Sequence, residues 1–124
     1  MPYHPLLNYL KTYRKRAGLT QDEVAFLLGC TSGAKVSRYE RLARRPSLET
    51  AFAYEALFRV PAREIFAGVF QKVEHKAIRR ARLLAEKVRT VEPDGVTARK
   101  LELLRAVASD SSGASPHIHE RNRD

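Results

Sequence analysis

The chain contains very little sulfur and no tryptophan: one cysteine and one methionine in 124 residues. A lone cysteine, Cys30, cannot form an internal disulfide, and without a second cysteine nearby it cannot begin a zinc-binding pair. We expect Cys30 to be a partly buried small residue, with a redox-active thiol as the less common alternative. A disulfide-stabilised scaffold and a cysteine-based zinc module are therefore both excluded.

Long apolar runs are also missing. The longest, such as "VAFLLG", fall far short of the roughly 20 residues that a membrane-spanning helix needs. The opening "MPYHPLLNYL" lacks the basic start, apolar core and small-residue cleavage site of a secretory signal. The sequence therefore predicts a cytoplasmic protein with no membrane partner.

Signals for catalysis are absent as well. We find no glycine-rich phosphate loop, no Ser/His/Asp or Cys/His arrangement and no paired carboxylates. His117 and His119 resemble half of a metal site, but no third ligand accompanies them. We therefore expect no enzyme, no catalytic residue, no metal site and no cofactor.

Positive charge is abundant. Lysine and arginine number 23 against 14 aspartate and glutamate, which gives a formal net charge of +9 and a pI of about 10.1. Such an excess favours a polyanionic partner such as nucleic acid or an anionic membrane surface. With 44% hydrophobic and 30% charged residues, the composition is that of a folded protein with one modest core.

The spacing of apolar residues predicts an all-α fold with five helices in residues 1–68. The first is expected over about 5–17, where Leu6, Leu7 and Leu10 recur at helical spacing before Gly18. The second begins at "TQDE", in which Thr20 and Glu23 can form a capping box, and ends at Gly29. The third is expected over 32–42, capped by Ser32 or Thr31.

Two more helices are expected before residue 68. Ser47 caps "LETAFAYEALF", whose apolar residues should complete the core: Leu48, Phe52, Leu57 and Phe58. Pro61 then opens the single turn "PAREIF".

The pattern changes in residues 69–108. The segment "FQKVEHKAIRRARLLAEKVRTVE" predicts a long charged helix with an apolar stripe consisting of Val73, Ala77, Ala81, Leu84 and Val88. A short helix follows in "VTARKLELLRAVA", with Leu101 and Leu104 on one face. The stripe is either a dimer seam, which we favour, or a surface that this short helix covers. Residues 109–124 have no periodicity and are expected to be a disordered tail.

The second and third helices carry the features that a helix-turn-helix needs. Ala25 is small enough for a close helix crossing, and Gly29 can adopt the positive φ of a tight turn. Val36 and Tyr39, three residues apart, would hold the third helix on the core. Its outward face would then carry Ala34, Ser37, Arg38 and Arg41, with Lys35 at the flank. A helix of this kind fits the major groove of DNA, which is about 12 Å wide.

The segments "LKTYRKRAGLTQDEVAFLLG", "VSRYE" and "RRPSLETAFAYEALFRVPAREIF" resemble the Cro/repressor-type, or XRE-like, helix-turn-helix family over about residues 6–66. The resemblance implies a lambda-repressor-like domain in residues 1–68 and a structural ion pair between Arg14 and Glu40. It implies base-edge contacts from Ala34, Lys35 and Arg38. The expected contacts to DNA phosphates come from Gln21, Ser32, Ser37, Arg41, Arg44 and Arg45.

The sequence departs from the family pattern in one place. The span from Gly29 to Glu40 is one residue longer than usual, and Gly33 and Ala34 occupy positions where polar base-reading residues are common. We expect the extra residue to lengthen the turn at 30–32. Base reading would then fall mainly on Arg38 and Lys35, since an arginine can donate two hydrogen bonds to guanine.

These observations predict a sequence-specific regulator of transcription that binds double-stranded DNA as a homodimer and is expected to act as a repressor. The rival hypothesis is an adaptor or antitoxin-like protein that binds a partner through the 73–88 stripe. The cations of the long helix, among them Arg79, Arg80 and Lys87, are either a solvated face, which is the more common case, or a second nucleic-acid surface. A membrane-surface role is disfavoured because the Ala-rich stripe is too weakly apolar.

Overall fold

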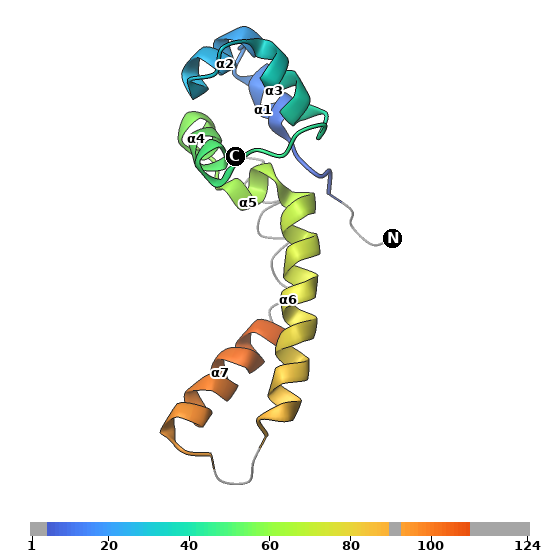
Figure 1. Cartoon of the computed structure of the whole chain (residues 1–124), viewed down its shortest axis with the longest axis vertical. Coiled ribbons are helices and arrows are strands. Elements are labelled where there is room, and N and C mark those ends of the chain that lie inside the picture. The colour runs from blue at the N-terminus through green and yellow to red at the C-terminus, as the bar shows by residue number, and fades with distance from the viewer. Residues whose placement is uncertain (1–4, 90–92, 110–124) are drawn as a thin grey trace. The chain divides into compact units, whose positions relative to one another are not determined.

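The computed structural model describes residues 5–89 and 93–109, and within these ranges it is all-α. The seven helices are α1 (Leu10–Arg16), α2 (Gln21–Leu28), α3 (Gly33–Glu40), α4 (Leu48–Phe58), α5 (Ala62–Ile65), α6 (Ala67–Lys87) and α7 (Gly95–Ser109), as Figure 1 shows. They belong to two compact units, residues 1–70 and 71–124. None of the described helices combines the length and the apolarity needed to cross a membrane. Most of the tail predicted as disordered lies outside the described residues.

Helix α1 begins at Leu10, five residues later than the sequence predicts. The preceding segment is held by tertiary hydrogen bonds instead: the Tyr9 amide donates to the Ile65 carbonyl over 2.7 Å, and the Gly68 amide donates to the Leu6 carbonyl over 2.9 Å. A Cβ atom at Gly68 would lie 2.6 Å from that Leu6 oxygen, so only glycine permits this approach. The early leucines therefore stay exposed, at 60% for Leu6 and 38% for Leu7.

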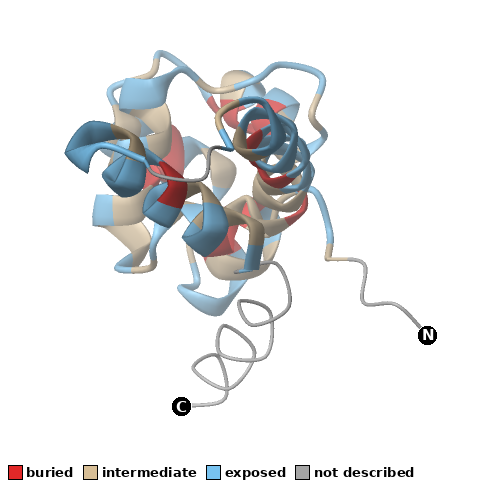
Figure 2. Cartoon of the chain, turned by 90° about the horizontal axis from the view of Figure 1, so that it is seen from below, coloured by how far each residue is buried: buried red, intermediate tan, exposed pale blue. Residues whose placement is uncertain are grey.

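The core of the first unit draws one or two residues from each of its five short helices: Leu10, Val24, Ala25, Val36, Tyr39, Tyr54 and Ile65. Figure 2 shows the buried positions as short patches on ribbons that are otherwise partly or fully exposed. Tyr54 is the largest fully buried side chain, with its ring 5.9 Å from that of Phe58 and edge-on to Tyr39. Its hydroxyl finds no hydrogen-bond partner among the described residues, and burial raises its pKa.

The prediction for α4 was wrong for two of its four core residues, Leu48 and Phe52. Leu48 and Phe52, expected in the core, are 71% and 55% exposed, whereas Tyr54 is buried and Leu57 and Phe58 are partly buried. Two sets of large residues compete along this helix, and the set that includes Tyr54 reaches the aromatic rings of Tyr39 on α3 and of Phe66, which follows α5.

The starts of α2 and α4 follow the sequence closely. The capping box of α2 is confirmed: the Thr20 hydroxyl accepts from the Glu23 amide over 3.1 Å, and the Glu23 carboxylate accepts from the Thr20 amide over 2.8 Å. At α4 the Ser47 hydroxyl accepts from the Thr50 amide over 3.2 Å. At α5 the Glu55 carboxylate accepts from the Ala62 amide over 3.0 Å. Side chains thus satisfy amides that helix geometry leaves without partners.

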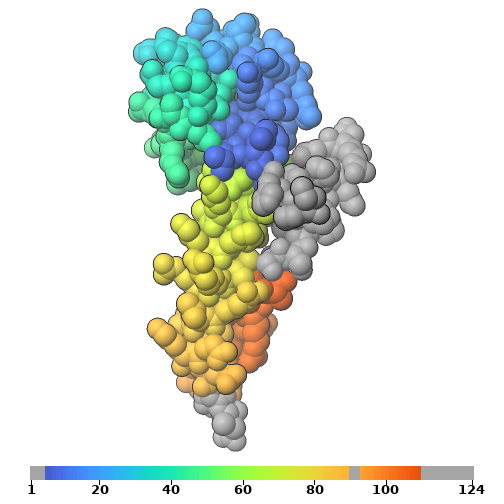
Figure 3. Space-filling model, turned by 90° about the vertical axis from the view of Figure 1, so that its right-hand side faces the viewer, coloured from blue at the N-terminus to red at the C-terminus, as the bar shows by residue number. Residues whose placement is uncertain are grey.

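The second unit contains most of α6 and all of α7, which turns back along α6 as a helical hairpin (Figures 1 and 3). Ile78, Ala81 and Leu101 are buried, and the Arg82 guanidinium donates to the Ala108 carbonyl over 3.4 Å. The predicted stripe is therefore split between two environments. Ala81 is buried and Val88 half-buried, but Val73, Ala77 and Leu84 remain exposed.

Candidate nucleic-acid interface

Helices α2 and α3 are joined by a turn in which Gly29 has φ of 76°, the left-handed conformation that the sequence predicts. The Cys30 amide donates to the Ala25 carbonyl over 2.8 Å and closes the end of α2. Ala25 itself is buried, and Cys30 is partly buried. The turn continues to Ser32, and α3 then runs from Gly33 to Glu40, slightly shorter than the predicted 32–42.

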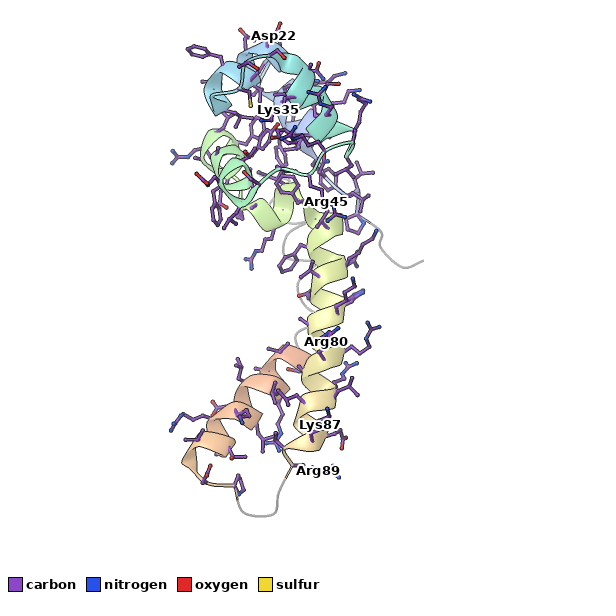
Figure 4. All side chains as sticks on the ribbon, in the orientation of Figure 1. Asp22, Lys35, Arg45, Arg80, Lys87 and Arg89 are labelled. Atoms are coloured by element: carbon purple, nitrogen blue, oxygen red, sulfur yellow. The ribbon has the colours of Figure 1, made fainter. Side chains whose placement is uncertain are left out.

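The start of α3 is held by Asp22 rather than by Ser32. Ser32 occupies the N-cap position, but its hydroxyl makes no capping hydrogen bond. The Asp22 carboxylate instead accepts from the Gly33 amide over 2.8 Å, and it lies at the upper edge of the unit in Figure 4. Sequence reasoning missed this contact because it joins residues on two different helices.

Gly33 is buried at the point where α3 meets the start of α2. A Cβ atom at this position would lie 2.5 Å from the Asp22 carboxylate and 3.0 Å from the Asp22 backbone nitrogen. The glycine that looked like a lost base-reading residue is therefore required by the helix crossing.

The two faces of α3 separate as the pattern predicts. Val36 and Tyr39 are buried at 0% and 3% exposure, so they fix the helix on the core. On the opposite side Ala34, Arg38 and Arg41 are exposed, while Lys35 and Ser37 are half-buried at the flanks. Figure 4 labels Lys35 on α3.

A buried ion pair ties the end of α3 to α1. The Arg14 Nε atom lies 2.6 Å from Glu40 Oε2, and its Nη2 atom donates to Glu40 Oε1 over 3.2 Å. The two side chains are 11% and 5% exposed. The hydrogen bonds to Glu40 raise the pKa of Arg14. This bidentate geometry fixes both side chains in one orientation.

The same network includes Gln21, which the resemblance assigned to a DNA phosphate. Its side-chain amide donates to Glu40 Oε1 over 3.2 Å, and Arg14 Nη1 donates to the Leu19 carbonyl over 3.0 Å. Asn8, a residue that the sequence did not single out, donates to the carbonyl of Tyr39 over 3.2 Å. The C-terminal end of α3 is thus fixed from α1, from the start of α2 and from the N-terminal segment.

Arginines follow α3 directly. The Arg41 Nε atom donates to the Ser37 hydroxyl over 3.3 Å, and Arg44 and Arg45 are exposed in the segment before α4. Leu42 bends the chain here with φ of 60°, and the Ala43 amide donates to the Arg38 carbonyl over 2.9 Å. Among the described residues, no carboxylate pairs with the cations of this surface: Lys35, Arg38, Arg41, Arg44 and Arg45.

The family model described as helix-turn-helix matches residues 10–65, the range that holds α1 to α5. No curated protein and no solved structure shows significant similarity to the chain.

Proposed function

Because residues 10–65 are a helix-turn-helix domain of the Cro/repressor type, a DNA-binding and not a catalytic family, we propose that the protein is a sequence-specific regulator of transcription that acts as a repressor. The observation that carries this proposal is the contrast between the faces of α3. One face is immobilised by Val36 and Tyr39, and the other exposes the guanidinium of Arg38, which forms no ion pair with the described residues. The proposed location of the protein is the cytoplasm, where it would meet its DNA.

Base reading is assigned to Arg38, with Lys35 and Ala34 beside it on α3. Arg38 has the geometry to donate two hydrogen bonds to one guanine in the major groove, and Ala34 can contact a thymine methyl group. The contribution of α3 to specificity depends on its fixed placement, because base edges must meet their donors within a few tenths of an ångström. The Arg14–Glu40 pair and the Asp22–Gly33 hydrogen bond supply that placement.

Phosphate contacts are assigned to the residues around this helix: Gln21, Ser32, Ser37, Arg41, Arg44 and Arg45. The exposed Arg44 and Arg45 have no carboxylate partner in the described part of the chain, so they fit this role best. The Gln21 side chain already donates a hydrogen bond to Glu40, and the Ser37 hydroxyl already accepts one from Arg41. Each would bind a phosphate as part of that network, with its remaining donor directed to the DNA.

The proposal is tested by selecting bound sites from random duplex DNA and then comparing variants on the selected site. Arg38→Ala should weaken binding by about 1 to 3 kcal/mol and relax the preference at one base pair. Arg44→Ala should weaken binding to all sequences alike. It should also lower the salt slope, which is the steepness with which the logarithm of the binding constant falls with the logarithm of the salt concentration, by about one unit. If Arg38→Ala lost equal affinity on random and selected DNA, Arg38 would contact only the backbone.

We also propose that the protein binds DNA as a homodimer through the part of the predicted stripe that stays exposed on α6: Val73, Ala77 and Leu84. Two-fold dimers of this class meet half-sites about 34 to 36 Å apart. Replacing Val73 and Leu84 together by glutamate should give a monomer in sedimentation and abolish cooperative binding to a palindromic site. The matched control replaces Val96 and Leu103, two residues of α7 that are at least as exposed as Val73 and Leu84. This dimer seam would be wrong if the parent protein were a monomer. It would also be wrong if only the control variant dissociated into monomers.

The same exposed residues favour the second candidate, an adaptor that binds a partner protein through α6. The two candidates differ in one measurement. An adaptor would enrich no sequence in the selection experiment, whereas a regulator would return one motif that depends on Arg38.

A further inference from the structure

One side of α6 carries a row of exposed cations. From Lys72 to Arg80 they recur at three- and four-residue spacing, and Lys87 follows two turns later, beyond the exposed Leu83, so the five cations share one face of the helix: Lys72, Lys76, Arg79, Arg80 and Lys87. We call this the α6 cationic face. It lies opposite the buried Ile78 and Ala81, and Figure 3 shows α6 side chains projecting on the side away from α7. Figure 4 labels Arg80 and Lys87 along this helix.

The charge of this face is not neutralised within the described part of the chain. None of its five cations forms an ion pair there, and Glu86 pairs instead with Arg89, at 3.8 Å in an exposed contact. The described residues between 71 and 109 hold ten lysines and arginines against four aspartates and glutamates, which leaves +6. Like charges such as Lys72 and Lys76, four residues apart on a helix, repel one another. A polyanion would relieve this repulsion.

Resting on the proposed function, we propose that the α6 cationic face binds the sugar-phosphate backbone of duplex DNA without regard to sequence, as a second contact beside the site that α3 reads. From Lys72 to Lys87 the face extends about 22 Å at 1.5 Å per residue. A duplex presents one phosphate charge per 1.7 Å of its axis, so a stretch of similar length offers roughly a dozen phosphates. Flexible lysines and arginines contact such a regular row of charges without a fixed geometry.

The surroundings of the face favour DNA over an anionic membrane. A helix that lies on a membrane needs an apolar side with aromatic residues to enter the lipid. Residues 71–87 contain no phenylalanine, tyrosine or tryptophan, so the exposed Val73, Leu83 and Leu84 are not accompanied by the aromatic residues that such a side needs. The helix-turn-helix domain of the same chain would also hold DNA at a high local concentration next to α6.

The test uses the full chain and two variants that each remove three charges from the second unit. The first replaces Lys72, Lys76 and Arg80 by glutamine. The matched control replaces three exposed cations of α7 by glutamine: Arg99, Lys100 and Arg105. Binding to a random duplex and to the selected site is measured as a function of salt, and circular dichroism checks that both variants keep their helices.

At 0.1 M salt the affinity of the first variant for random duplex should be lower than that of the parent protein by a factor of about ten or more. The salt slope of its binding should be smaller by about two to three units. The ratio of affinities for selected and random DNA should stay unchanged, since backbone contacts do not read sequence. The control should change affinity less than threefold and the slope by less than one unit.

Equal losses in the two variants would overturn the proposal, because net charge alone would then explain them. An α6 variant that binds DNA like the parent but loses binding to vesicles of anionic phospholipid would assign the face to a membrane and also overturn it. Failure of the proposed function would give a different result. If the selection returned no DNA motif, base reading by α3 would be wrong. The difference in affinity for random duplex between the α6 variant and the α7 control would still decide the role of α6.

Discussion

Helices α3 and α6 both present arginine and lysine to solvent, but they are supported in opposite ways. In α3, Gly33, Val36 and Tyr39 are buried within eight residues, and hydrogen bonds from other helices fix both ends. In the part of α6 that belongs to the second unit, only Ile78 and Ala81 are buried. The difference matches two kinds of DNA contact. Base reading requires a rigidly placed donor, whereas a phosphate contact tolerates a loosely held one.

Tyrosine provides a way to observe the two units separately. All five tyrosines of the chain lie within residues 3–54 and the chain has no tryptophan, so tyrosine fluorescence reports unfolding of the first unit. Circular dichroism reports the helices of both.

The largest difference is expected between the two ion pairs. Glu40→Ala leaves Arg14 as an unpaired buried cation, and we expect it to lower the free energy of unfolding of the first unit by about 3 to 5 kcal/mol. Glu86→Ala removes the exposed partner of Arg89, where both side chains are at least 70% exposed, and should cost less than about 0.5 kcal/mol. Urea unfolding followed by tyrosine fluorescence and circular dichroism measures both. Similar losses would mean that the two regions are supported alike.

The next difference concerns two glycines at helix starts. Gly33→Ala places a Cβ against the backbone of Asp22 and should destabilise the first unit by about 1 to 3 kcal/mol. Gly95→Ala, at the start of α7, meets no atom closer than 3.8 Å and should leave stability unchanged or raise it slightly. Thermal unfolding of the two variants provides the comparison. A fully stable Gly33→Ala protein would show that α3 can shift away from α2.

A smaller effect is expected from two helix caps. Thr20→Ala should lower the stability of the first unit by about 1 kcal/mol at any pH, since a hydroxyl does not titrate there. Asp94 caps α7 by accepting from the Thr97 amide over 2.7 Å, and this hydrogen bond lowers its pKa below the ordinary value of 3.8. Its contribution is therefore present above pH 3.8 and is lost as the pH falls through the lower value. Carbon NMR of the Asp94 carboxylate measures this pKa, and a value at or above 3.8 would refute the cap.

The smallest effect is expected at Ser32. Ser32→Ala should change stability by less than about 0.5 kcal/mol, because its hydroxyl makes no capping hydrogen bond. Asp22→Ala, which removes the acceptor of the Gly33 amide, should cost about 1 kcal/mol. Any loss of DNA binding in the stable Ser32 variant then reports a direct phosphate contact. A destabilised Ser32 variant would instead restore its role as the helix cap.

What the sequence revealed in this protein was mostly local. The Thr20–Glu23 capping box, the left-handed Gly29 and the inward pair Val36 and Tyr39 all depend on residues a few positions apart, and their patterns are specific. The Arg14–Glu40 pair joins residues 26 positions apart, and only the resemblance to a known family indicated it.

The parts that were missed depend on contacts between elements. The late start of α1 follows from hydrogen bonds to Ile65 and Gly68, which no local pattern encodes. Along α6 two overlapping sets of apolar residues have helical spacing, one through Val73 and one through Ile78, and both include Ala81. Periodicity alone could not choose between them, because the neighbouring segment determines which set is buried.

The close contact at Gly33 also limits how this domain can be given new specificity. Position 33 lies at the start of α3, where the pattern of related domains places a base-reading side chain, yet it has no room for any side chain. A combinatorial library that varies α3 should therefore keep Gly33 constant and place its diversity at Ala34, Lys35 and Arg38. Diversity at residue 33 would yield destabilised clones rather than new binding specificities, unless Asp22 is replaced by a smaller residue and the crossing of α2 and α3 is redesigned with it.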